Sequence, residues 1–376
     1  MPWKEVTKMT SKIEFVQLAL KKSATFSDLC DRYKISRKTG YKWVNRYIER
    51  GVAGLEEMSR RPHSSPSATS LEMEEKVLAI RKRKQSWGGK KIRSLLLNKG
   101  EENVPASSTV TDILHRHHLI KIDEYRKLQT PQRFEHEAPN DLWQADFKGH
   151  FAMRKGRCHP LTILDDHSRF SIGLRACDNE RGATVKSHFT EVFEEYGLPW
   201  RINFDNGSPW ATSHSREFRY TEFSIWLIRL GIRVSFSKIR HPQTNGKDER
   251  FHRTLKTELL QFNYFWDIKD AQKNFNVWRD EYNLERPHEA LNMKPPISRY
   301  SISMRKYSSV LPEIEYRDED LVCKVNAAGN ISYKKKKYFI SESLNGLPVA
   351  IRSIDEHKAN VYFCQQKILC IDTKCT

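Results

Sequence analysis

The sequence predicts a multidomain protein with all-α helix-turn-helix units first, then an α/β core with a mixed sheet, then a small all-β C-terminal module. Length is the first reason, because 376 residues at about 150 per domain suggest two to three domains. The hydrophobic pattern is the second, since it is helical up to about residue 125 and strand-like from residue 141. The short strand-like runs after Pro296 are the third. We expect domains at 1–58, 71–130, 135–300 and 310–376, with a linker at 59–70.

The charge balance favours a polyanionic partner. Lys and Arg total 65 and Asp and Glu total 47, a formal charge of +18. Residues 1–130 hold 27 basic and 15 acidic residues, which is two thirds of the excess. No apolar run approaches the roughly 18 residues that span a bilayer, which argues against a membrane protein. The seven cysteines are scattered without a C-x2-C pair, so a disulfide framework is disfavoured and a reducing cytosol fits.

The first sixty residues have the pattern of a helix-turn-helix. Helices are expected over residues 11–22, from about Ser27, and over 37–50, where Ser36 can cap the third helix and Gly51 can end it. The third helix is basic on one side, which indicates DNA binding, although a solvated face is the alternative. Ile35, Trp43, Val44 and Tyr47 should pack inward, and Arg37, Lys38, Lys42 and Arg46 should face out as candidate DNA contacts.

A linker and a second helical unit follow. Residues 59–70 are rich in proline and small polar residues, which is typical of a linker. Arg60 and Arg61 could reach a minor groove, but a plain tether is the simpler interpretation. The second unit also has a helix-turn-helix-like outline, with Lys90 and Lys91 as further candidate DNA contacts. Its helices are expected at 71–84, 90–98 and about 108–117.

From residue 141 the order of elements predicts the α/β core. Three strands are followed by helix, strand, helix and strand, and then by two helices, an order typical of a mixed sheet. The strands are expected at 142–150, 161–165, 172–176, 201–204 and 233–236, and the helices at 183–196, 218–230, 246–261 and 268–283.

Three carboxylates occupy positions that such a sheet can bring together. Asp146 lies within the first strand, where Asp is depleted, and Asp205 ends the fourth strand. Glu249 begins the helix expected at 246–261. Oxygen ligands in low number suit Mg²⁺ or Mn²⁺, and two such ions about 3.5–4 Å apart can activate an attacking hydroxyl and stabilise a leaving oxygen. Any one of these residues alone is more often structural, so the prediction depends on all three.

The helix expected at 246–261 adds cations to this group. His252, Arg253 and Lys256 follow Glu249 at i+3, i+4 and i+7, so they share its face and are candidate DNA contacts. Asp248 is the rival of Glu249 as third ligand. Asp165 and Asp166 end a strand and are expected to be hairpin residues.

The stretches around these carboxylates resemble the integrase-core motifs of bacterial insertion-sequence transposases of the DDE class, which share the ribonuclease H-like fold with retroviral integrases. By that resemblance Asp146, Asp205 and Glu249 are the catalytic, metal-binding triad. The 43 residues between Asp205 and Glu249 exceed the usual integrase spacing, so we expect a longer loop around 212–221. The matching stretches are 144–147, 164–169, 204–209 and 241–252 in the core and 1–6, 35–43 and 59–63 near the N-terminus.

The resemblance implies a DNA transposase that binds transposon ends, cleaves phosphodiester bonds and joins the 3′-hydroxyl ends to target DNA. The expected cofactor is Mg²⁺, two ions per active site, with Mn²⁺ as a substitute. The expected partners are double-stranded DNA, both terminal inverted repeats and target, and further copies of the chain in a homodimer or higher oligomer at the bacterial nucleoid. The alternative is a domesticated, non-catalytic DNA-binding regulator with a retained core. The C-terminal module is expected to be β-barrel-like, and its run 334–337 of four lysines either contacts DNA or forms a solvated hairpin.

Overall fold

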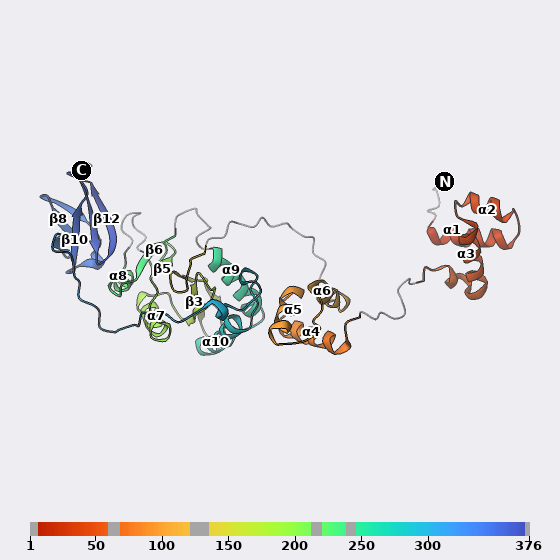
Figure 1. Ribbon diagram of the computed structural model, residues 1–376, viewed down its shortest axis with the longest axis horizontal. Coiled ribbons are helices and arrows are strands. Elements are labelled where there is room, and N and C mark those ends of the chain that lie inside the picture. The colour runs from red at the N-terminus through yellow and green to blue at the C-terminus, as the bar shows by residue number, and fades with distance from the viewer. Residues whose placement is uncertain (1–6, 59–67, 121–134, 212–219, 238–245, 373–376) are drawn as a thin grey trace. The chain divides into compact units, whose positions relative to one another are not determined.

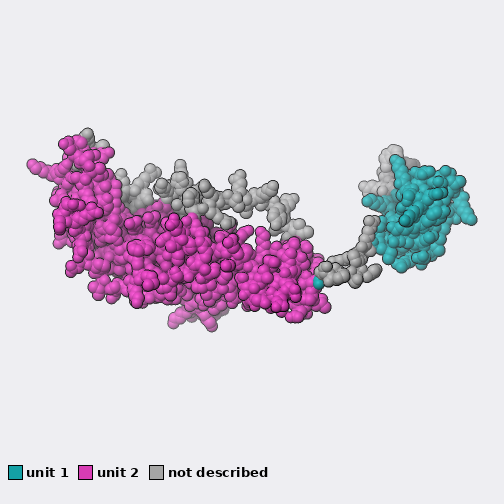
Figure 2. Space-filling model, viewed as in Figure 1, with its two compact units in different colours: residues 1–68 teal, residues 69–376 magenta. Residues whose placement is uncertain are grey.

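The structure is a computed structural model that describes residues 7–58, 68–120, 135–211, 220–237 and 246–372. The chain divides into two compact units, Met1–Ala68 and Thr69–Thr376 (Figure 2). Within the described ranges, no helix combines the length and apolar character that crossing a membrane requires. Arg60 and Arg61, the predicted minor-groove residues, lie outside the described residues.

The first unit contains the three helices that the sequence predicts. Hydroxyl side chains begin the helices, and Ser36 Oγ accepts a hydrogen bond from Thr39 N at 3.2 Å at the start of the third. Trp43 is buried in the small core, and Ile35, Val44 and Tyr47 pack against that core, as predicted. The elements are α1 (Lys8–Leu20), α2 (Phe26–Arg32), α3 (Arg37–Arg50) and the 3₁₀ turn η1 (Gly51–Leu55).

The second unit begins with another three helices (Figure 1). Gly89 lies where the second and third of them meet, because a Cβ there would lie 2.4 Å from the carbonyl oxygen of Ser107. This bundle contacts the α/β core, where Ser94 Oγ donates to the carbonyl of Met293 at 2.9 Å. The helices are α4 (Leu71–Arg83), α5 (Gly89–Asn98) and α6 (Ser107–Arg116).

The α/β core is built on the predicted mixed sheet. Strands β1, β3 and β4 are antiparallel neighbours, while β5 and β6 continue the sheet parallel to β1. Strand β2, which the sequence did not predict, forms a short hairpin with the start of β3. The strands are β1 (Trp143–Phe147), β2 (Phe151–Ala152), β3 (Arg157–Asp165), β4 (Ser171–Cys177), β5 (Arg201–Phe204) and β6 (Arg233–Phe236).

Helices cover both faces of this sheet. Alternate residues of β3 point to opposite faces, so Ile163 packs with α7 and α8 while Leu164 packs with α9 and α10. The predicted single helix at 246–261 is α9 followed by a π-helical segment, η3. The elements are α7 (Gly182–Tyr196), α8 (Glu222–Arg229), α9 (Gly246–Leu255), η3 (Lys256–Leu260), α10 (Ile268–Leu284), η4 (Glu289–Leu291) and η5 (Pro296–Arg299).

The C-terminal module is all-β, as predicted, and forms a four-stranded and a two-stranded antiparallel sheet. It covers the edge of the core sheet, because the side-chain amide of Gln366 accepts from Val234 N at 2.9 Å and donates to Val234 O at 2.7 Å. Lys334 and Lys335 form the turn of the two-stranded hairpin at positive φ. The elements are β7 (Leu321–Lys324), β8 (Asn330–Tyr333), β9 (Lys336–Phe339), η6 (Glu342–Leu344), β10 (Pro348–Ser353), β11 (Lys358–Phe363) and β12 (Gln366–Asp372).

Candidate active site

Two of the three predicted carboxylates lie side by side at one end of the sheet. Strands β1 and β5 are parallel and pair Trp143 with Ile202 and Gln144 with Asn203. Continuing this register by two residues places Asp146 beside Asp205, which follows the last residue of β5. The structure therefore brings together residues that are 59 positions apart in the sequence.

This pair has an unfavourable electrostatic environment. Burial raises the pKa of Asp146 to about 7, and the neighbouring carboxylate of Asp205 adds to the rise. Burial likewise raises the pKa of Asp205, although the amide of Gly207 donates to its carboxylate at 3.0 Å. Glu180 lies close enough to raise the pKa of both groups further. Among the described residues, neither Asp146 nor Asp205 forms an ion pair.

Helix α9 packs against β1 and is anchored there at its first turn. Lys247 of α9 lies 2.5 Å from Asp166 Oδ2, and Gln144 Nε2 of β1 donates to Asp166 Oδ1 at 2.8 Å. Asp166 itself follows the end of β3. One carboxylate thus joins the helix to the strand that carries Asp146.

A second contact fixes the next turn of α9. His252 Nε2 lies 2.8 Å from Thr162 Oγ1, which donates to the carbonyl of Asp146 at 2.9 Å. Because the single hydroxyl proton of Thr162 goes to that carbonyl, His252 Nε2 must carry the proton it donates. Burial and nearby Lys148 lower the pKa of His252 to about 4, so the imidazole is neutral at physiological pH. Glu249 stands between the two anchoring contacts on α9.

The structure distinguishes Asp248 from Glu249. Asp248 lies on the same helical stripe as Phe251 and Leu255 and is only 3% exposed, and its Oδ1 has no hydrogen-bond partner among the described residues. Burial and the charge of Asp146 hold the pKa of Asp248 well above its usual value. Glu249 is exposed and lies one turn before His252 on α9. The two candidates therefore differ in exposure: Glu249 is open to a ligand from solvent, whereas Asp248 is buried and close enough to Asp146 to feel its charge.

The donor set fits a divalent cation of the Mg²⁺ class. Asp146 and Asp205 are crowded carboxylates, and a bound cation would remove the repulsion that raises their pKa values. Within the part of the chain that the structure describes, no group of three His, Cys, Asp or Glu side chains is arranged to hold a metal ion. Among the described residues, Glu249 is therefore not joined to Asp146 and Asp205 in one three-residue cluster.

Comparisons with known proteins identify domains along the chain. The chain matches the integrase core domain family over residues 136–242 and 230–296, a helix-turn-helix domain over 11–63 and a homeodomain-like domain over 39–114. An uncharacterised protein of insertion element IS136 from Agrobacterium fabrum is 30% identical over 142 residues, which cover 36% of this chain and 69% of that protein. The chain belongs to the integrase-core family of insertion-element proteins.

Other members and solved structures extend the comparison. The transposase of insertion sequence element IS904 from Lactococcus lactis is 26% identical over 255 residues (62% of this chain, 96% of that protein). An IS476 protein from Xanthomonas euvesicatoria is 23% identical over 250 residues (65% and 69%). The HTLV-2 integrase catalytic core with magnesium is 20% identical and covers 39% of this chain and 88% of its own, with a TM-score of 0.30. A simian T-cell lymphotropic virus intasome chain is 16% identical and covers 79% and 98%, with a TM-score of 0.38.

Sequence reasoning on this integrase-core protein missed Lys148. It directly follows the last residue of β1, two positions after Asp146, and burial together with the charge of Lys256 lowers its pKa. Two lysines that feel each other's charge are suited to a phosphate. The signal was the alternation of Gln144, Asp146 and Lys148, which points all three to one face.

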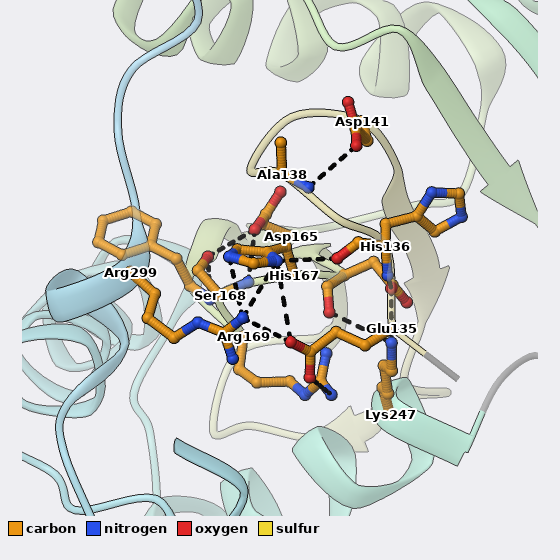
Figure 3. Close-up of polar contacts among 12 residues, drawn as sticks. Glu135, His136, Ala138, Asp141, Asp165, His167, Ser168, Arg169, Lys247 and Arg299 are labelled. Atoms are coloured by element: carbon orange, nitrogen blue, oxygen red, sulfur yellow. Dashed lines mark hydrogen bonds and ion pairs between the residues drawn. The ribbon is translucent and has the colours of Figure 1, made fainter. Parts of the chain in front are cut away.

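The turn after β3 also does more than the hairpin role predicted for it. Asp165 does act within the turn, because it accepts from Ser168 N at 2.8 Å and from Ser168 Oγ at 2.5 Å (Figure 3). It also accepts from Asn140 N at 2.8 Å. Its neighbour Asp166 instead reaches Lys247 on α9, which the sequence did not indicate.

The predicted DNA contacts of the integrase-core chain fall into two environments. Arg37, Lys38 and Lys42 are exposed on α3, while Arg46 is half-buried and its guanidinium lies 5.4 Å from the centre of the Trp43 ring. In the second helical bundle, Lys90 and Lys91 each lie 3.6 Å from a core carboxylate, Glu289 and Glu258 respectively, and burial lowers the pKa of Lys91 to about 8. Arg253 and Lys256 are exposed on the helix that carries Glu249.

Proposed function

We propose that this protein is a DNA transposase that binds the ends of a mobile element, cleaves phosphodiester bonds there and joins the 3′-hydroxyl ends to target DNA. The observation that carries the proposal is the buried, mutually repelling pair of Asp146 and Asp205 on neighbouring parallel strands, with the helix of Glu249 anchored alongside. Such a pair is costly without a cation, and it is the arrangement that metal-dependent phosphoryl transfer requires.

Asp146, Asp205 and Glu249 would hold two Mg²⁺ ions, with Mn²⁺ as a substitute. When bound, these ions supply charge stabilisation at the attacking and leaving oxygens of the phosphodiester. The chain's own contribution is positioning. Lys148 and Lys256 attract the scissile strand's phosphates, and neutral His252 keeps α9 against β1 without adding a charge beside the carboxylates.

Recognition of the ends is assigned to the helical units. Helix α3 follows the turn of the helix-turn-helix, and its N-terminal half carries the exposed cations Arg37, Lys38 and Lys42. In such domains the N-terminal residues of this helix contact base edges in the major groove. Arg253, Lys256 and the second bundle contribute phosphate contacts closer to the active site. Joining two ends to one target requires two active sites, so the working form is a homodimer or higher oligomer on double-stranded DNA.

The catalytic part is tested with single substitutions on an end-containing duplex. Asp146→Ala, Asp205→Ala and Glu249→Ala should each abolish Mg²⁺- or Mn²⁺-dependent strand cleavage and joining while end binding persists. Asp248→Asn should retain activity, since the Asp248 side chain is buried on the same face of α9 as Phe251 and Leu255. Cleavage by Glu249→Ala at the wild-type rate, or activity that survives EDTA, would contradict the scheme.

Binding is tested separately, because a regulator without catalysis would also bind. Residues 1–68 form a compact unit with their own core, so this fragment should bind end DNA with a salt slope of about −0.9 per neutralised phosphate. Lys42→Ala should weaken that binding about tenfold. Specific binding together with an inactive wild-type core would favour the domesticated regulator.

A further inference from the structure

Asp166 is a buried carboxylate that joins three segments distant in the sequence. Besides Gln144 Nε2 at 2.8 Å and Lys247 Nζ at 2.5 Å, it accepts from the backbone N–H of His136 at 3.0 Å, and its own carbonyl accepts from Lys247 Nζ at 3.2 Å. Asp166 is 3% exposed, and Lys247 is largely buried as well. Figure 3 draws Lys247 together with residues of the turn after β3, to which Asp166 belongs.

The two side chains that Asp166 holds are each two residues from a proposed metal ligand. Gln144 precedes Asp146 on β1, and residues i and i+2 of a strand point to the same face. Lys247 precedes Glu249 in the first turn of α9, so holding Lys247 fixes how that turn sits over the strand. The contact of His252 with Thr162 fixes only the following turn.

We propose that Asp166 and Lys247 are positioning residues that set the separation between Asp146 and Glu249, and so determine how tightly the site binds its divalent cations. The inference rests on the proposed function in one respect, namely that Asp146 and Glu249 share those cations. Neither positioning residue touches the cation. They act because the ion pair between buried Asp166 and partly buried Lys247 gives the helix one orientation.

Substitution of Lys247 distinguishes positioning from a simple charge effect, because the two explanations predict opposite changes in cation affinity. Lys247 is a cation near an acidic site, so removing its charge favours cation binding on electrostatic grounds alone. If Lys247 positions α9, removing it weakens cation binding instead. Outer contacts that orient metal ligands typically contribute about 10–100-fold in metal affinity.

The experiment is a Mn²⁺ titration of the full-length protein without DNA, with free Mn²⁺ followed by electron paramagnetic resonance. Lys247→Met should weaken Mn²⁺ affinity about tenfold or more, and Lys247→Arg, which keeps the ion pair, should stay within about threefold of wild type. Arg250→Met is the matched control, because Arg250 is an exposed cation on the same turn of α9. That control should bind Mn²⁺ as wild type does or slightly more tightly.

The outcomes distinguish this inference from the proposed function. Wild-type or tighter Mn²⁺ binding by folded Lys247→Met would overturn the positioning role. Wild-type Mn²⁺ binding by Asp146→Ala would instead overturn the metal site itself, whatever Lys247 does. Should Lys247→Met fail to fold, Asp166→Asn serves in its place, since it keeps the shape of the side chain and removes the charge. The same loss of affinity is then expected, and its absence again refutes the proposal.

Discussion

Two pairs of aspartates lie close together in the core and meet opposite environments. Asp165 and Asp166, after β3, receive hydrogen bonds or an ion pair from Ser168, Asn140, Gln144, His136 and Lys247. Asp146 and Asp205, on β1 and after β5, are partly buried, lie beside each other and form no ion pair among the described residues. The first pair is saturated with donors and the second is short of positive charge.

The difference shows what separates a structural carboxylate from one available to a cation. All four residues lie in a strand or directly after one. Two of them are adjacent as Asp-Asp, so in the sequence alone that stretch has more negative charge than either isolated aspartate. What decides their role is the supply of donors from elsewhere in the fold. Burial raises the pKa of Asp165 as well, but hydrogen bonds from Ser168 and Asn140 act against that rise, whereas the charge of Asp205 adds to the rise at Asp146.

An Asp→Asn substitution should therefore have different effects on the free energy of unfolding in the two pairs. Asp165→Asn places an NH₂ group against buried N–H donors and should lower the free energy of unfolding by about 3 kcal/mol. Asp205→Asn removes one of two repelling charges and should leave stability unchanged or raise it. Urea unfolding at pH 8 without metal measures both. Equal destabilisation by the two variants would break the comparison.

The sequence predicted the unsaturated pair but not the full role of the saturated one. Asp146 and Asp205 could be found because each has an unusual place in a strand pattern and lies in a stretch that resembles the integrase-core motifs, whereas their pairing across parallel strands is seen only in the structure. The link from Asp166 to Lys247 depends on how α9 sits on β1, and residues 81 positions apart carry no local signal for that. The contact between Gln366 and Val234 at the sheet edge could not be predicted either, because it also joins residues far apart in the sequence.

Local patterns also set the limits of the helix and strand predictions. The caps at Ser36 and the patterned helices were predicted correctly, because capping and periodicity are properties of neighbouring residues. Strand β2 has only two residues, too few for an alternation to be seen. The change from α9 to the π-helical η3 leaves the apolar stripe intact, so the sequence indicated a single helix.

Stability should also fall with rising pH because of Asp146. Burial and Asp205 raise its pKa to about 7 in the folded protein, whereas the unfolded chain loses that proton near its ordinary value. Between about pH 4 and 7 the folded state holds the extra proton, so the free energy of unfolding decreases as pH rises through that window. At pH 8 without metal, Asp146→Asn should be more stable than wild type by about 2 kcal/mol, and near pH 4 the two should converge.

Urea midpoints measured from pH 4 to 8 test this pH dependence. The exposed Asp318→Asn is the control and should follow the wild-type curve. Parallel curves for wild type and Asp146→Asn would show that the pKa of Asp146 is not raised in the folded protein, either by burial or by Asp205.

Divalent cations should relieve the unsaturated pair. At pH 8, 10 mM Mg²⁺ should raise the unfolding free energy of the wild type by about 1.4 kcal/mol if its dissociation constant is about 1 mM, and EDTA should reverse the gain. Asp146→Asn and Asp205→Asn should lose this response, whereas Asp318→Asn should keep it. A full response in Asp146→Asn would place the bound ion elsewhere on the chain.

The smallest effect concerns Glu180, the third carboxylate near the unsaturated pair. Its oxygen lies 2.7 Å from His159 Nδ1, yet its charge still raises the pKa of both Asp146 and Asp205. Glu180→Gln should therefore lower the titration midpoints of both aspartates, and for Asp146 the change should be smaller than the one caused by Asp205→Asn, because Asp205 exerts the stronger repulsion. Carboxyl ¹³C NMR titration resolves the midpoints, with Glu194→Gln, an exposed residue of α7, as control. An unchanged Asp146 midpoint in Glu180→Gln would mean that the His159 contact already neutralises Glu180, and the acidic edge would then consist of Asp146 and Asp205 alone.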